Sequence, residues 1–103
     1  MNGETLQRLV VVANPQGLHM RPAAEFAKAA RRYQSDVVVR LADRSVDGKS
    51  IIDLITLAAE HGSQLVLEIR GDDAHDALAA LEGILEVCDW DEVGEIADPP
   101  KIG

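Results

Sequence analysis

Aromatic residues are scarce in this 103-residue chain, which has one Phe, one Tyr and one Trp. The core is therefore expected to be aliphatic, and base-stacking surfaces for nucleic acid are not expected. The lone cysteine, Cys88, cannot form an internal disulfide, so a reducing cytoplasm is the expected location. No apolar run approaches the roughly 18 residues of a membrane-spanning helix, and no secretory leader pattern opens the chain, so membrane insertion is not expected.

Basic residues are also few, with 10 Lys and Arg against 18 Asp and Glu. The formal net charge of −8 disfavours non-specific binding to nucleic acid or anionic membranes, which leaves a protein partner or a small molecule. The apolar fraction of 47% supports one packed domain. We expect this domain over residues 1–87, followed by an acidic, loosely ordered extension over residues 88–103.

The hydrophobic periodicity predicts seven elements. Strands are expected over residues 6–13, 37–41, 44–46 and 65–70, and helices over residues 20–33, 51–61 and 74–87. Ser50 is predicted to cap the second helix, with Gly62 ending it in a left-handed conformation, and Asp72 or Asp73 to cap the third. Half-polar alternation in the strands predicts an α/β open-faced sandwich in which three helices cover one face of a four-stranded antiparallel sheet.

The segment from Asn14 to Ala23 joins the first strand to the first helix and carries the clearest chemistry. His19 precedes the helix, and a neutral imidazole nitrogen is a nucleophile near neutral pH. The first amides of a helix attract anions, and Arg21 adds a cation that can bind phosphate oxygens. Pro22 suits a first helical turn, since that turn needs no N–H there. The junction is therefore predicted to accept and hold a phosphoryl group.

A second motif, Gly48-Lys49-Ser50-Ile51-Ile52, has its serine thirty-one positions after His19. With Asn14, Gly17-Leu18-His19 and Arg21-Pro22-Ala23, it closely resembles the HPr family, the histidine phosphocarriers of the bacterial phosphoenolpyruvate-dependent sugar phosphotransferase system. The resemblance extends from Thr5 to about Val87 in the same element order.

This resemblance implies a carrier that takes a phosphoryl group from phosphorylated enzyme I onto Nδ1 of His19 and passes it to an enzyme IIA. Arg21 would be the charge partner of the phosphoryl group, and the backbone amides of Met20 and Arg21 would hold its oxygens. Such a protein is a stoichiometric carrier rather than a turnover enzyme, needs no metal or cofactor, and is expected to be a monomer.

Ser50 matches the regulatory serine that an HPr kinase/phosphorylase modifies in many members of the family. A phosphate there would add about −1.5 to −2 charge beside an apolar docking surface and weaken pairing with enzyme I. The residues that match the docking surface are Lys49, Ile51 and Ile52, bordered by Met20. Lys49 also joins Arg21 and Lys28 in a local basic patch that an acidic enzyme I would need.

Other interpretations remain open. Ser50 can be an ordinary helix cap, and Ile51 can be a core residue. The chain can be mainly a regulatory interaction protein controlled through Ser50, with little or no sugar transport. It can also be a phosphatase that uses His19 as a covalent intermediate, although no acid other than the distant Glu25 is available. His61, His75 and Cys88 lack the spacing of metal ligands.

Overall fold

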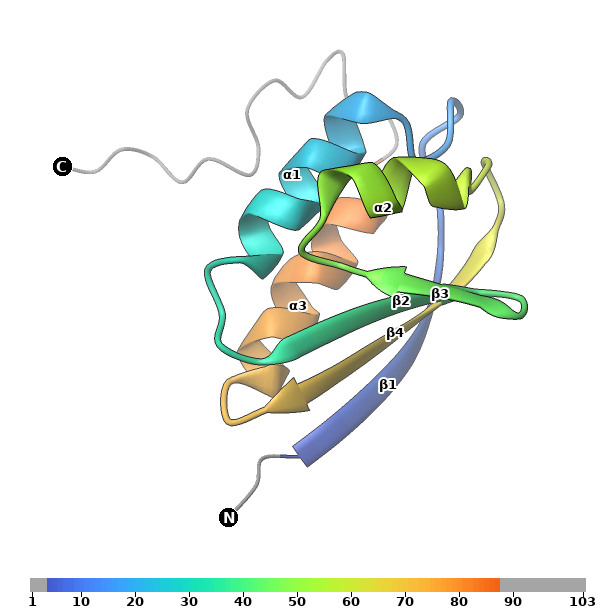
Figure 1. The fold of residues 1–103 in the computed structure, drawn as a ribbon. Helices are drawn as coiled ribbons and strands as arrows, with labels where there is room; N and C mark the ends of the chain where they lie inside the picture. Colours follow the sequence, from blue (N-terminus) through green and yellow to red (C-terminus); the bar gives the residue numbers. More distant parts are fainter. Residues whose placement is uncertain (1–3, 88–103) are drawn as a thin grey trace, which may run out of the picture.

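The computed structural model describes residues 4–87, and the expected extension over residues 88–103 lies outside the described residues. Seven elements follow in the predicted order: β1 (Glu4–Val11), α1 (Met20–Ala30), β2 (Asp36–Leu41), β3 (Arg44–Asp47), α2 (Ile51–Leu57), β4 (Gln64–Gly71) and α3 (Ala74–Leu85). Figure 1 shows the three helices on one side of the sheet and its other face open. The predicted open-faced sandwich is therefore confirmed.

The four strands form one antiparallel sheet in the order β1-β4-β2-β3. β4 shows how the sequence determines the two faces, because Leu65, Leu67 and Ile69 are fully buried under the helices. Glu68 and Arg70 alternate with them on the open face, as the period of two requires. The last strand in the sequence thus forms the centre of the core.

Helix α1 contributes a small-residue face to this core. Phe26 and four alanines are among its buried residues, and the alanines allow close approach to its neighbours. The buried residues of the described chain are otherwise almost entirely aliphatic, as the composition predicts. None of the described helices is long and apolar enough to cross a membrane.

The end of α2 differs from the prediction. The helix stops at Leu57, and its left-handed cap is Ala58, with φ of 55°, rather than the predicted Gly62. The carbonyl of Ala59 instead accepts a hydrogen bond from the amide of Leu18 at 2.9 Å. A long-range contact therefore replaces the next helical turn, and Gly62 turns the chain toward β4 with φ of 85°.

Candidate functional site

The loop between β1 and α1 is closed on itself by Asn14. The Asn14 side-chain amide donates to the carbonyl of Gly17 at 3.0 Å, and the Gly17 amide donates to the carbonyl of Asn14 at 2.9 Å. Asn14 is buried, so these bonds satisfy a polar group that would otherwise lose its hydration. The loop that precedes His19 is therefore held in one conformation.

Gly17 allows this loop to pack closely against the residues that follow α2. Its φ is +78°, and a Cβ atom at this position would lie 2.6 Å from the carbonyl oxygen of Ala59. The next residue, Leu18, is buried and donates its amide to that same carbonyl. Only glycine combines this backbone conformation with this close approach, so the position of the following histidine depends on it.

His19 occupies the N-cap position of α1. Its backbone is extended, with φ of −86° and ψ of −166°, and its carbonyl accepts the helical hydrogen bond from the amide of Ala23 at 3.0 Å. The His19 ring is half-buried and makes no side-chain capping bond within the described residues. The imidazole is thus not used to cap the helix, and it lies where the first-turn amides of α1 favour an anion.

Arg21 and Met20 lie in the first turn of α1, next to His19. Arg21 is half-buried, whereas the Met20 side chain is 62% exposed. Pro22 follows and has no N–H to offer. The predicted nucleophile, its predicted charge partner and the predicted amide donors are therefore brought together in one helical turn.

Glu25, the distant acid of the phosphatase interpretation, lies well down the helix. Six residues at 1.5 Å each place it about 9 Å from His19 along the axis. Within residues 4–87 its Oε1 atom is buried without a hydrogen-bond partner. This separation argues against Glu25 as the general acid at His19, because such an acid has to lie within hydrogen-bond reach of the reacting group.

The predicted docking residues divide into two kinds. Ile52, like Met20, projects from its helix and is 68% exposed. Ile51 is partly buried and packs against the core. The Lys49 ammonium donates to the carbonyl of Tyr33 at 2.9 Å, which ties the β3–α2 turn to the end of α1. Docking stays a prediction for all four residues, but Ile51 and Lys49 also stabilise the fold.

Ser50 caps α2 as predicted, because its Oγ accepts a hydrogen bond from the amide of Asp53 at 3.2 Å. The Arg31 side chain, just after α1, donates to the carbonyl of Lys49 at 2.9 Å. The start of α2 thus meets the end of α1, while the Leu18–Ala59 bond joins the end of α2 to the start of α1. The two helices run in opposite directions, so Ser50 lies beside the end of α1, whereas His19 lies at its start; α1 itself has eleven residues and is about 16 Å long.

One polar network outside this site was not predicted. Asp73, expected to cap α3, makes no capping bond and instead accepts from the amides of Gln34 and Ser35 and from the Ser35 hydroxyl. The Ser35 hydroxyl, followed by the Gln34 amide, lowers the pKa of Asp73 below its ordinary value. These partners lie 38 and 39 residues apart in sequence, a separation that local patterns cannot reveal.

In residues 4–87, no group of three or more His, Cys, Asp or Glu side chains is arranged to hold a metal ion. The chemistry of the site is that of a nitrogen nucleophile beside a helix N-terminus and an arginine. Phosphoryl transfer needs mainly positioning and electrostatic stabilisation, and this junction can provide both.

Comparison with known sequences agrees with this geometry. A family model described as the PTS HPr component phosphorylation site matches residues 6–87. The phosphocarrier protein HPr of Pseudomonas putida is 43% identical over 75 residues, which cover 72% of this chain and 83% of the relative. Residues 88–103 lie beyond the family match.

Comparison with solved structures gives the same result. The crystal structure of a phosphocarrier protein HPr from Bacillus anthracis str. Ames matches with a TM-score of 0.76 at 34% identity, covering 79% of this chain and 96% of that one. The solution structure of Crh, the Bacillus subtilis catabolite repression HPr, matches with a TM-score of 0.60 at 36% identity, covering 79% and 96% respectively.

Proposed function

Because the chain belongs to the HPr family of phosphocarriers in the phosphotransferase system, we propose that His19 accepts a phosphoryl group from phosphorylated enzyme I and passes it to an enzyme IIA. The Nδ1 lone pair attacks phosphorus, the bond from phosphorus to the donor group breaks, and Nε2 keeps its proton. The reverse displacement, with the enzyme IIA group as nucleophile, returns the imidazole. This exchange needs no redox step, and we place it in the cytoplasm.

The observation that supports this proposal most directly is the position of His19 at the N-cap of α1 with its ring uninvolved in capping. The helix end attracts the phosphoryl oxygens, and the Met20 and Arg21 amides lie in the turn that faces them. Arg21 adds a permanent positive charge two residues away. The protein is then a stoichiometric carrier, since its reaction leaves it phosphorylated until a partner removes the group.

A labelling experiment tests the assignment of His19. With enzyme I and phosphoenolpyruvate, the chain is expected to gain one phosphoryl group that is labile in acid and stable in base, detected by intact-protein mass spectrometry. His19→Ala should abolish this gain. His61→Ala and His75→Ala are matched controls, because both side chains are exposed and outside the junction. Labelling that survives in His19→Ala would overturn the proposal.

We further propose that a serine kinase of the HPr kinase/phosphorylase type regulates the protein at Ser50. Ser50 and His19 lie beside opposite ends of α1, and salt at 0.1 M screens exposed charges over a Debye length of about 10 Å. A phosphate on Ser50 is therefore expected to act on partner docking near the exposed Ile52, rather than on the chemistry at His19.

Ser50→Asp tests whether a negative charge at this position acts on docking and not on the chemistry at His19. It should raise the KM for enzyme I by roughly fivefold, equivalent to about 1 kcal/mol, and leave the maximal rate of phosphorylation unchanged. The exposed Ser45 supplies a control, because Ser45→Asp adds the same charge on β3. A fall in the maximal rate at saturating enzyme I, or the same effect from Ser45→Asp, would contradict the docking mechanism.

A mainly regulatory role is the second candidate, and the structural similarity to the catabolite repression HPr favours considering it. In that role a kinase would modify Ser50, while His19 would not pass its phosphoryl group to any enzyme IIA. Transfer of label from the His19 phosphoprotein to an added enzyme IIA distinguishes the two roles.

A further inference from the structure

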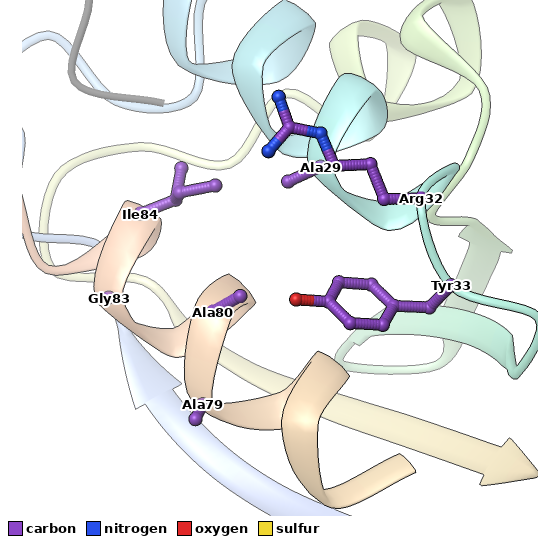
Figure 2. A pocket seen from close by; sticks show the side chains of 7 residues that line it. All are labelled: Ala29, Arg32, Tyr33, Ala79, Ala80, Gly83 and Ile84. Atoms are coloured by element: carbon purple, nitrogen blue, oxygen red, sulfur yellow. The ribbon is translucent and has the colours of Figure 1, made fainter. Parts of the chain in front are cut away.

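A groove of about 390 Å³ lies between α1 and α3 (Figure 2). Small residues of both helices leave this space open, namely Ala29 on α1 with Ala79, Ala80 and Gly83 on α3. Figure 2 shows the Tyr33 ring reaching from the α1 side toward Ala80, with Arg32 beside it. The groove is therefore largely apolar and has a cation at one side.

Arg32, two residues beyond the end of α1, continues a row of cations on that helix, which we call the basic stripe: Arg21, Lys28 and Arg32. At 100° per residue, the spacing of seven places Arg21 and Lys28 within about 20° of one another on α1, and Arg32 follows Lys28 by four residues in the turn after the helix. Lys28 and Arg32 are exposed and Arg21 is half-buried, whereas the buried residues of α1 lie on the opposite side. The basic stripe thus follows the solvent side of the helix and meets the groove at Arg32.

The C-terminal segment, residues 88–103, begins close to this surface. Near the end of α3 the carbonyl of Leu85 accepts from the amide of Ala13 at 3.2 Å, so α3 ends beside the loop that leads to His19. Sixteen residues follow Val87, and an extended chain of that length reaches about 50 Å. This exceeds by far the roughly 16 Å length of α1.

The charge of the C-terminal segment complements the basic stripe. The segment contains five carboxylates and one cation, Lys101, so it carries −4 of the chain's net charge of −8. The carboxylates belong to Asp89, Asp91, Glu92, Glu95 and Asp98. Between them lies Trp90, the only tryptophan of the protein, with Val93 and Ile96 following at intervals of three.

We propose that the C-terminal segment folds back onto this face, with the Trp90 indole in the groove and the carboxylates along the basic stripe. The groove has room for one large apolar side chain, and burying an indole there removes apolar surface from water. Individual exposed ion pairs are weak, but attachment at Val87 keeps the segment at high local concentration. The preferred occupant is therefore this chain's own terminus.

Trp90 fluorescence in the full-length chain tests the docking. The native protein should show blue-shifted emission and weaker acrylamide quenching than the urea-unfolded chain. A Cβ atom at Gly83 has no neighbour within 4 Å, so Gly83→Ala fits the fold, and circular dichroism establishes that Gly83→Phe is also folded. Gly83→Phe fills the groove and should raise the quenching constant about twofold by returning the indole to solvent, whereas Gly83→Ala should leave it unchanged.

The charge contribution has its own pair of variants. Arg32→Glu should increase Trp90 quenching, and so should 1 M salt, because both weaken attraction to the carboxylates. Arg70→Glu makes the same charge change on β4, on the open face of the sheet, and should have no effect. Circular dichroism melts of each variant confirm that the fold is retained.

Three outcomes would overturn the proposal. Native Trp90 could be as accessible to acrylamide as in the unfolded chain. It could be shielded but insensitive to both Gly83→Phe and Arg32→Glu, which would place it elsewhere. Its shielding could also depend on protein concentration together with dimer formation in sedimentation, which would make a second copy the occupant.

Discussion

At the scale of single residues, Gly17 has two separable constraints, its positive φ and its contact with Ala59. We expect Gly17→Ala to lower the free energy of unfolding by about 2–4 kcal/mol, because a left-handed alanine and an overpacked contact each cost about 1–2 kcal/mol or more. Urea unfolding followed by circular dichroism measures this change.

Gly62 provides the matched control. Its φ is +85°, but a Cβ atom there would have no neighbour within 4 Å. Gly62→Ala should therefore lower the free energy of unfolding only by the cost of a left-handed alanine, about 1 kcal/mol. Equal destabilisation by the two substitutions would mean that the contact with Ala59 carries no energy.

The residues of the junction illustrate what a sequence reveals at this scale. His19 and Arg21 could be assigned to a helix start because Pro22 and the alanines after it define that start locally. The structural role of Lys49 could not be predicted, since its acceptor is the backbone carbonyl of Tyr33, sixteen residues away. Every residue has a backbone carbonyl, so only the fold identifies the carbonyl to which a lysine donates.

At the scale of elements, Asp73 joins the start of α3 to the segment before β2 by accepting three hydrogen bonds. Its pKa is lowered in the folded state from an ordinary 3.8. A group of this kind stabilises the fold above its unfolded pKa and loses that contribution as the pH falls through the folded pKa.

Asp73→Ala should accordingly lower the urea midpoint at pH 7. The difference from the unsubstituted chain should shrink as the pH falls below about 3.8, where the unfolded state begins to bind a proton, and should vanish below the lower folded pKa, where the carboxylate is protonated in both states. Asp72→Ala removes the neighbouring exposed carboxylate as a control. A difference that stays constant between pH 7 and pH 2.5 would show that the ionised form is not responsible.

The elements themselves could be predicted where their pattern is local. The alternation in β4 and the apolar stripe of α3 gave both elements to within two residues of the observed ends. The predicted helix over residues 51–61 was too long, because the contact of Ala59 with Leu18 outweighs a helical continuation that the sequence alone permits. Likewise, β1 runs from Glu4 to Val11 and so begins and ends two residues before the predicted strand over residues 6–13. Val12 forms its backbone hydrogen bonds with Ser63 and Gly62 in the turn before β4, outside the sheet.

At the scale of the whole molecule, the fold class could be predicted because each layer has its own periodicity. The strand order β1-β4-β2-β3 could not be predicted from these periodicities. It depends on which strands pair with each other once the connecting helices have packed on the sheet. The family resemblance assigned the two motifs to the starts of the first and second helices, where the structure has them. Their position relative to each other could not be predicted, because it depends on the antiparallel arrangement of α1 and α2.

That arrangement has a consequence for signalling. Salt at 0.1 M screens exposed charges over about 10 Å, which weakens the direct interaction between charges at opposite ends of α1. A phosphate on Ser50 would therefore oppose modification of His19 through weaker docking of enzyme I, and not through direct repulsion at the reacting nitrogen. A single small domain would then report the supply of phosphoryl donor at one end and the activity of a kinase at the other, and a partner spanning both ends could read the two together.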